Sequence, residues 1–308
     1  MPPGGYPHVG SALGGFLAGF LEGEASFNIT RQAGWANHRC RMTLCVRDDD
    51  RTLIASLAKA TRIGSVTSQE ARATSKPQVT WQVCAKSDCA RLIEILDAYP
   101  LRGRKSYDYA IWRAAVRFWV ADDPTRYEKN RDWEPMRYLK LQLSAARRFD
   151  PTRAPYEIRE QHRPAKSDWN AYIAGLITAD GSLAIVRNGQ GYVPVVHITL
   201  RADDRPLLEA ECRRAGAGTI YDQRGRKWAP SASWMVRDGY GLLKVTNLLD
   251  TERPRGRKLA EYAIWRRAVR DYASGLPRTE VRTRLSALRR QLAEIRRYKA
   301  NNLSASAA

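Results

Sequence analysis

The chain reads LAGFLEGEA at residues 17–25 and IAGLITADG at residues 173–181. In both stretches apolar and small residues run into an acid at the eighth place, which is Glu24 in the first stretch and Asp180 in the second. We interpret each stretch as an apolar helix, rich in small residues, that ends at its acid. Because the two acids lie 156 positions apart, the pattern predicts one structural unit present twice.

Further repeats support this duplication. Residues 102–117 match residues 255–270 at 12 of 16 positions, and RDDDR at residues 47–51 returns as RADDR at residues 201–205. A chain of 308 residues is long enough for two units of about 150 residues, each able to bury its own core. Length and repetition therefore predict two copies of one fold in tandem.

Hydrophobic alternation predicts the strands of each unit. Residues 39–47 alternate basic or hydroxyl side chains with apolar ones, which is typical of a half-buried strand, and residues 26–30, 79–83 and 196–201 alternate in the same way. Helical patterns fill the gaps at residues 51–62, 88–98, 106–120, 205–215, 239–249 and 259–273. We therefore expect an α+β fold made of two pseudo-symmetric αββαββα repeats, each followed by a further helix.

The charge points to a polyanionic partner. Lys and Arg number 52 against 32 Asp and Glu, which gives a formal charge of +20 and a pI of about 10.1. Because the basic residues are spread over both halves, an extended nucleic-acid surface is favoured over an appended basic tail. On charge alone, a ribosomal-type structural protein stays open.

The polar faces of the predicted strands offer donors and acceptors suited to base edges in the major groove of DNA, where Arg pairs with guanine and Asn or Gln with adenine. An ordinary solvated sheet face is the alternative. The predicted DNA-binding residues are Asn28, Thr30, Arg39, Arg41, Thr43, Arg47, Thr80, Gln82, Arg187, His197, Thr199, Arg201 and Ser233.

The five cysteines and the apolar start of the chain indicate an intracellular protein. An odd number of cysteines in a long chain favours free thiols, and Cys40 and Cys45 would point to opposite faces of one strand, which argues against zinc. Residues 9–21 have no basic residue before them and are too short to span a bilayer. We expect no membrane partner, no secretion, and a location in the cytoplasm, the nucleoid or an organelle matrix.

The motifs resemble those of single-chain LAGLIDADG homing endonucleases that carry two motifs. The resemblance covers roughly residues 11–150 and 168–298. It implies that the two acid helices pack at the interface between the halves, and that the two antiparallel sheets form a saddle over DNA. The small residues that match the family motif are Ala18, Gly19, Gly23, Ala174, Gly175 and Ala179.

The resemblance also implies the catalytic residues. Glu24 and Asp180 match the metal-binding acid at the eighth place, one for each DNA strand. Mg²⁺ suits such a site because it accepts one or two carboxylates together with phosphate oxygens and water, and Mn²⁺ is the alternative. Lys105 and Lys258 match the family's basic residue near the scissile phosphate, where a lysine stabilises developing charge or only contacts the DNA backbone.

Some positions depart from the family pattern. Asp48 and Ala202 stand where many relatives have a Gln that reaches the metal-bound water, so the two active sites are predicted to be unequal. The ninth place of the first motif is Ala25 rather than Gly, and the sixth place of the second is Thr178 rather than an acid. Neither change removes a predicted metal ligand.

We expect a first repeat at residues 1–121, a connector with a helix near 134–148 at residues 122–167, and a second repeat at residues 168–308 that ends in a helix near 277–298 and a disordered tail. The predicted function is that of a monomeric, Mg²⁺-dependent endonuclease, intron-encoded or free-standing. It would cut double-stranded DNA at a long pseudo-palindromic site on the order of 20 base pairs, with the short 3′ overhangs typical of the family. The alternatives are a group I intron RNA maturase and a noncleaving DNA-binding regulator of the same fold.

Overall fold

The computed structural model describes residues 6–31, 38–71, 76–121, 132–150, 166–223 and 229–297. Most of the predicted connector and the predicted disordered tail lie outside these residues. The elements of the first half are α1 (Ser11–Glu24), β1 (Ala25–Arg31), β2 (His38–Arg47), η1 (Asp48–Asp50), α2 (Arg51–Thr61), β3 (Ser65–Gln69), β4 (Gln78–Val83), α3 (Lys86–Ala98), α4 (Lys105–Val120) and α5 (Glu134–Ala146).

The second half repeats this order. Its elements are α6 (Lys166–Asp180), β5 (Gly181–Asn188), β6 (Gly191–Arg201), η4 (Ala202–Asp204), α7 (Arg205–Ala215), β7 (Thr219–Gln223), β8 (Ser231–Val236), α8 (Gly239–Thr251), α9 (Arg257–Tyr272) and α10 (Arg278–Arg296). The predicted α+β repeat is confirmed. Each predicted helix lies within a few residues of its observed bounds.

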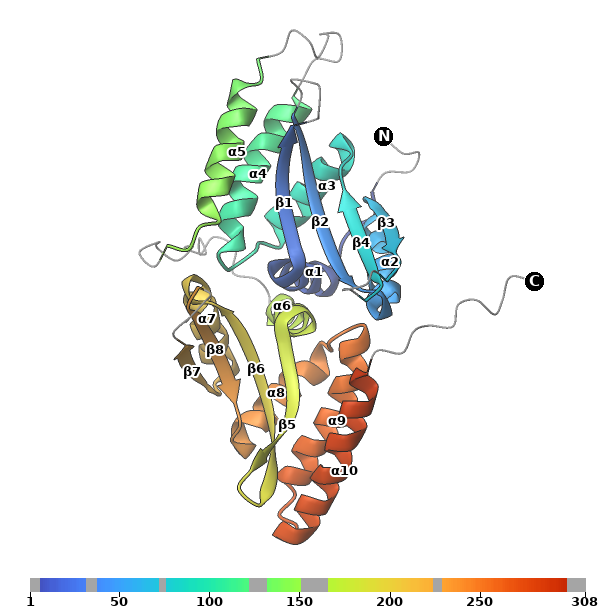
Figure 1. Ribbon diagram of the computed structural model, residues 1–308, viewed down its shortest axis with the longest axis vertical. Helices are drawn as coiled ribbons and strands as arrows, with labels where there is room; N and C mark the ends of the chain where they lie inside the picture. The colour runs from blue at the N-terminus through green and yellow to red at the C-terminus, as the bar shows by residue number, and fades with distance from the viewer. Residues whose placement is uncertain are drawn as a thin grey trace, which may run out of the picture.

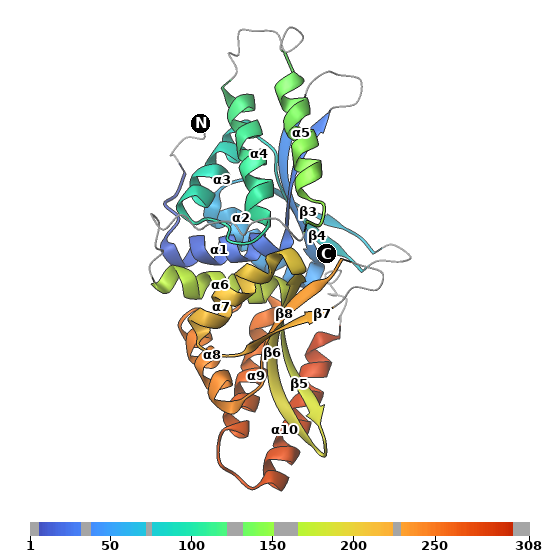
Figure 2. The same cartoon turned by 90° about the vertical axis from the view of Figure 1, so that its left-hand side faces the viewer.

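Each half contains one four-stranded antiparallel sheet, with strand order β1-β2-β4-β3 in the first and β5-β6-β8-β7 in the second. Helices α3 and α4 cover one face of the first sheet, and α8 and α9 cover the matching face of the second (Figure 1, Figure 2). The covered face of β2 is apolar at alternate positions, as predicted, because Met42 and Leu44 are buried while Arg39 is exposed. The alternation therefore decides which face of the sheet receives the helices.

The edge strands β3 and β7 were not located by the sequence patterns. Both consist mainly of polar residues, and all but one residue of each are exposed. Each pairs with only one neighbour, β4 or β8. Each of these short strands places only one partly buried residue against the core, Val66 in β3 and Ile220 in β7, which is too little to produce an alternating pattern.

Helices α1 and α6 lie side by side in the middle of the molecule and join its halves (Figure 2). The Cα of Gly19 faces the carbonyl oxygen of Tyr172, and Gly175 faces that of Phe16 in the same way. At both positions a Cβ would overlap the facing oxygen. The small residues of the two motifs therefore permit the close helix contact that joins the repeats.

The helices α5 and α10 occupy equivalent places, α5 against α4 and α10 against α9. Arg147, just after α5, donates to the carbonyl oxygen of Phe27, and Arg296 of α10 donates to that of Leu183 at 2.7 Å. Each arginine thus holds the strand that follows an acid helix. Among the described residues, no helix is long and apolar enough to cross a membrane.

Candidate active site and nucleic-acid interface

The two predicted acids end the two central helices. Glu24 is the last residue of α1 and Asp180 is the last residue of α6. A Cβ on Gly23 would stand 2.5 Å from the Asp180 Oδ2, so the Asp180 carboxylate lies directly beside the end of α1. The helix contact therefore brings the two acids together, and each is followed at once by the first strand of its sheet.

The two carboxylates lie in an environment that disfavours negative charge. Burial raises the pKa of Glu24 to about 7, and the neighbouring Asp180 carboxylate adds to that shift. Burial also raises the pKa of Asp180, while Lys105 opposes the shift. A site with two close carboxylates and too little positive charge suits a divalent cation, which accepts one or two carboxylates together with phosphate and water oxygens.

Each predicted lysine is fastened to the end of the acid helix in its own half. The Lys105 Nζ donates to the carbonyl oxygens of Gly23 at 2.7 Å and of Leu21 at 3.3 Å. The Lys258 Nζ donates to the carbonyl oxygen of Gly181 at 2.8 Å. Burial lowers the pKa of both lysines. The Lys105 charge acts on both acids, and the Lys258 charge acts on Asp180.

The sixth place of each motif has a structural role. The Glu22 carboxylate accepts bonds from the backbone nitrogen of Arg102 at 2.8 Å and of Gly103 at 3.1 Å, and from the Tyr172 hydroxyl at 3.0 Å. Its counterpart, the Thr178 hydroxyl, accepts a bond from the Arg255 backbone nitrogen at 3.2 Å. Both residues hold the loop that leads into a lysine helix, so Thr178 replaces an acid without losing this contact.

Asp48 and Ala202, the positions where the two active sites are predicted to differ, have different side-chain contacts. The Asp48 Oδ1 accepts two bonds from Arg51, from Nε at 3.0 Å and from Nη2 at 2.7 Å. Ala202 has no polar side chain to do the same for Arg205, which instead pairs with Glu209 and Asp222. The two halves thus differ in the side-chain contacts of this turn.

The open face of the first sheet carries most of the predicted DNA-binding residues. Asn28 stands opposite Arg41, and Thr43 stands opposite Gln82, all on the face away from the helices. The Arg41 Nε and the Thr80 hydroxyl have no hydrogen-bond partner among the described residues. The remaining predicted residues of this face are Thr30 and Arg39, which pair across β1 and β2, and Arg47, which is bound to Asp49.

The second sheet places His197, Thr199 and Arg201 on the equivalent face, with Thr199 exposed and His197 half-buried. Burial lowers the pKa of His197, and the nearby Lys258 and Arg296 add to the effect. The Arg201 guanidinium is bound to Asp203 and to the carbonyl oxygen of Arg147. Of these three side chains, Arg201 is therefore already bound within the protein, as its counterpart Arg47 is in the first sheet.

Two predicted residues are not exposed on the open face. Ser233 lies on that face opposite Thr199, but it is only 1 % exposed, and its hydroxyl lies 2.7 Å from that of Thr199. Arg187 shares the parity of the buried Leu183 and Ile185, which places it on the opposite side of β5 beyond the end of the core. An alternating pattern shows which residues share a face of a strand. It does not show whether a residue on that face is covered by a neighbour, or whether the strand extends beyond the core.

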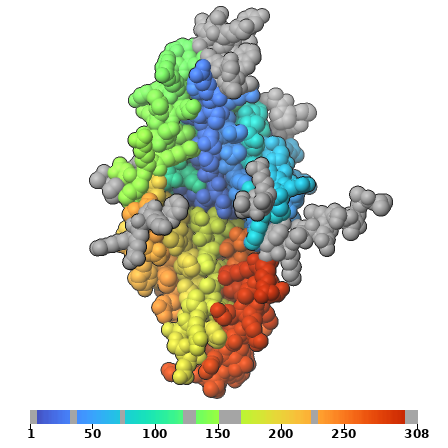
Figure 3. All heavy atoms as spheres, in the orientation of Figure 1, coloured from blue at the N-terminus to red at the C-terminus, as the bar shows by residue number. Residues whose placement is uncertain are grey.

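The open faces of both sheets lie on one side of the molecule. In Figure 3 the surface of β1 and β2 continues into that of β5 and β6 across the middle. The strands diverge from the acids at the centre. This arrangement gives one extended surface with the two carboxylates at its midpoint.

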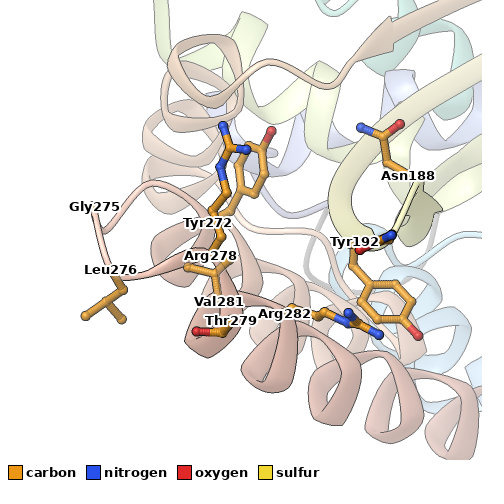
Figure 4. A pocket seen from close by; sticks show the side chains of 11 residues that line it. Asn188, Tyr192, Tyr272, Gly275, Leu276, Arg278, Thr279, Val281 and Arg282 are labelled. Atoms are coloured by element: carbon orange, nitrogen blue, oxygen red, sulfur yellow. The ribbon is translucent and has the colours of Figure 1, made fainter.

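A cavity of about 760 Å³ lies at the far end of the second half, between the β5–β6 hairpin and the start of α10 (Figure 4). Arg278, Arg282, Tyr192 and Tyr272 line it, and none of its lining residues is acidic. The length of β5, about 23 Å at the usual rise per residue, separates Asn188 at this cavity from Asp180. The cavity is therefore separate from the acidic site.

The cysteines form no metal site in the described part of the chain. Cys40 is buried and Cys45 is exposed on the opposite face of β2, as their spacing predicts. No group of three or more His, Cys, Asp or Glu side chains is arranged to hold a metal within the described ranges. Glu24 and Asp180 are a pair of carboxylates, so a divalent cation held there would need water and phosphate oxygens as its further ligands.

The comparisons with known proteins agree with this fold. The model of the LAGLIDADG endonuclease family matches residues 17–116. The structure of the LAGLIDADG homing endonuclease I-SmaMI bound to cleaved DNA superposes with a TM-score of 0.70 at 17% identity, and the match covers 95% of this chain and 100% of that one. The resemblance to the LAGLIDADG endonucleases is confirmed.

Two other solved LAGLIDADG structures match over nearly the same extent. I-SmaMI bound to an uncleaved DNA target in the presence of calcium ions has a TM-score of 0.70 at 17% identity, covering 93% of this chain and 99% of that one. The meganuclease I-AabMI bound to uncleaved DNA has a TM-score of 0.68 at 17% identity, covering 91% and 98%. No curated protein sequence matches the chain. The whole chain therefore has the LAGLIDADG fold, although its sequence has diverged far from these structures.

Sequence reasoning assigned no role to several polar residues around the LAGLIDADG helices. Asp50 and Asp204 contact the opposite half of the molecule, and Glu22 holds the loop before Lys105. A signal was present, because the Asp-Asp repeat recurs at equal spacing in both halves. The repeat does not say which segment its carboxylates contact.

Proposed function

We propose that this chain is a site-specific endonuclease of double-stranded DNA, with one active centre for each strand. The observation that carries the proposal is the meeting of Glu24 and Asp180 at the joined ends of α1 and α6, at the midpoint of two open polar sheet faces. The formal charge of +20 favours a polyanion on that surface. The relatives solved with cleaved and uncleaved DNA support DNA as the substrate.

Glu24 and Asp180 are the residues that would hold a divalent metal. Such an ion, when bound, supplies positive charge to the scissile phosphate and lowers the pKa of a coordinated water. The raised pKa of both carboxylates fits this role, because a bound cation would offset the desolvation and the repulsion that disfavour their negative charge. The calcium ions of the I-SmaMI structure support a divalent metal. We expect Mg²⁺, with Mn²⁺ able to replace it.

The two lysines act beside the acids. Bonds to backbone carbonyls fix the ammonium groups of Lys105 and Lys258 at the start of β1 and β5, where the DNA backbone would pass. A fixed positive charge in a partly buried site stabilises the charge that develops on a phosphate oxygen during hydrolysis. Each lysine therefore serves the strand cut at the acid of its own half.

The open sheet faces bind the DNA on either side of the cut. Arg41, Asn28 and Gln82 offer the donors and acceptors that read base edges in a major groove. If each sheet spans about one helical turn, the site is on the order of 20 base pairs. Because one chain contains both centres, the proposed enzyme acts as a monomer at a pseudo-palindromic site and leaves short 3′ overhangs.

A cleavage library tests this function. The protein is incubated with Mg²⁺ and a randomised DNA library, together with fragments of its host locus, and new DNA ends are sequenced. We expect paired ends offset by a few nucleotides within one recurrent sequence, and none with the Glu24→Gln, Asp180→Asn double variant. Binding to the library with no new ends under any divalent metal would contradict the nuclease and favour a noncleaving regulator. Tighter binding to group I intron RNA than to DNA would favour a maturase.

A further inference from the structure

Two carboxylates reach across the interface between the halves. Asp50, in the η1 turn of the first half, accepts bonds from Arg257 of the second half, from its backbone nitrogen at 2.8 Å and its Nε at 2.9 Å. Asp204, in the η4 turn of the second half, accepts a bond from the backbone nitrogen of Arg104 of the first. The same contact therefore occurs twice, once in each direction across the interface.

These contacts end on the residues next to the lysines. Arg104 precedes Lys105, and Arg257 precedes Lys258, at the first turn of α4 and α9. The backbone nitrogens of a first helical turn have no partner within their helix, and a carboxylate there also interacts favourably with the helix dipole. Each aspartate therefore fixes the beginning of a helix at the position from which a lysine side chain departs.

The local fit is close. A Cβ on Gly103 would stand 2.7 Å from the Asp204 Oδ1, and a Cβ on Gly256 would overlap the Asp50 Oδ1. Gly256 also has a φ of +61°, which favours glycine. The Gly-Arg-Lys sequence shared by both halves therefore has glycine where the carboxylate of the other half must approach the backbone.

Each arginine continues the contact along its own helix. Arg104 pairs with Asp108, which lies 3.6 Å from the Arg147 guanidinium. In the second half the corresponding series of charges is Arg257, Glu261 and Arg296, and Glu261 also lies 3.6 Å from the Lys258 Nζ. In the second half Asp50 is thus joined to Lys258 through Arg257 and Glu261.

We infer that Asp50 and Asp204 are positioning residues that each orient the lysine of the opposite half, so that neither active centre is complete within one repeat. The inference rests on the proposed nuclease function. A purely structural brace between halves would lower stability and slow both strands alike. A positioning residue instead slows the strand served by the lysine that it orients.

Strand-resolved cleavage tests this difference. With a duplex labelled on either strand, Asp50→Ala should slow the strand served by Lys258 by about 10–100-fold, the range seen when outer partners of a reactive group are removed. Asp204→Ala should slow the other strand to a similar degree. The dissociation constant for DNA should be unchanged in both. Asn at either position should restore part of the rate, because the amide oxygen still accepts the backbone bond.

Matched controls come from two carboxylates that contact the same two helices from within their own half. Asp97 of α3 accepts a bond from Tyr109 of α4, and Asp250 of α8 accepts one from Tyr262 of α9. Asp97→Ala and Asp250→Ala therefore remove a carboxylate that holds each lysine helix without touching the crossing contact. They should leave the ratio of the two strand rates unchanged. Equal slowing of both strands by Asp50→Ala or Asp204→Ala, compared at equal folded fraction, would overturn the inference.

Amide hydrogen exchange of the full chain gives a readout that needs no cleavage. Asp50→Ala should speed exchange at residues 257–259, and Asp204→Ala at residues 104–106, each in the opposite half. Unchanged exchange there would overturn the positioning role. Failure of the wild-type protein to cut any DNA would contradict the proposed function instead, and the exchange result would still decide whether the contact orders the opposite lysine helix.

Discussion

The Cα of Gly19 lies against the carbonyl oxygen of Tyr172, leaving no room for a side chain between α1 and α6. This contact holds the two repeats together and sets how closely their helix ends approach. Since Glu24 and Asp180 occupy those ends, the spacing of the helices decides whether the acids can serve one DNA duplex.

A methyl group at Gly19 should therefore separate the halves. We expect Gly19→Ala to lower the free energy of unfolding by about 1–3 kcal/mol, the usual cost of overpacking, and to slow cleavage of both strands. Gly10→Ala is the control, because a Cβ there meets nothing within 4 Å. Urea denaturation of both variants measures the effect. Equal stability of the two would show that the close contact is not needed.

Glu211 should make stability depend on pH. Its carboxyl is fully buried, and burial raises its pKa from 4.5 to about 8 although Arg102 and Arg214 oppose the shift. The folded state holds the Glu211 proton more tightly than the unfolded chain does. This proton therefore contributes fully to the free energy of unfolding below pH 4.5, and its contribution is lost as the pH rises to about 8.

Glu211→Gln should remove this pH dependence, because an amide does not titrate. The free energy of unfolding of the wild type, measured relative to that of the variant, should therefore fall by roughly 1 kcal/mol per pH unit between about pH 5 and 8. Urea denaturation at several pH values measures it. Glu209→Gln, two residues away on the same helix and partly exposed, is the control. The same pH slope for both variants would mean that Glu211 does not retain its proton.

Each lysine should act on one strand. Lys105→Met and Lys258→Met are each expected to slow the cutting of a different strand by about 10²–10³-fold, as when one group that stabilises developing charge is removed. Strand-labelled duplex measures both rates. The exposed Lys59 of α2 supplies a control, and Lys59→Met should cut normally. Slowing of the same strand by both variants would contradict the assignment of one lysine to each centre.

The wild-type protein should cut its two strands at different rates. Lys258 is buried and lies near Glu261, whereas Lys105 is partly exposed and bound to backbone carbonyls of the helix end, and Asp48 has no polar counterpart at Ala202. Nicked plasmid should therefore accumulate before linear product when supercoiled DNA carrying the site is digested. Conversion of both strands at one rate would count against this asymmetry.

Much of the fold could be predicted because the same sequence pattern occurs in both halves of the chain. The repeated block around Trp112 and Trp265 marks the same helix in both halves, and the alternation of residues 39–47 gives the buried face of β2. The same repetition predicts the close packing of α1 and α6, since small residues precede Glu24 and Asp180 in both motifs. Repetition removed the ambiguity that a single motif leaves.

The remaining features depend on tertiary contacts. Ser233 alternates correctly but is covered within the sheet, and Arg187 extends beyond the core where alternation loses its meaning. Asp50 and Asp204 lie in polar turns whose direction is set only when the two halves dock. Local pattern carries no information about which half a turn will face.

The most direct test of the account compares Glu24→Gln and Asp180→Asn with the wild type, measuring binding and strand-resolved cleavage of the same DNA with Mg²⁺. In each variant the cleavage rate of one strand should fall by more than the roughly 10–100-fold that is lost when a residue supporting a metal ligand is removed. The dissociation constant for DNA, measured with Ca²⁺, should stay the same. Full cutting of both strands by either variant would contradict the paired-acid mechanism.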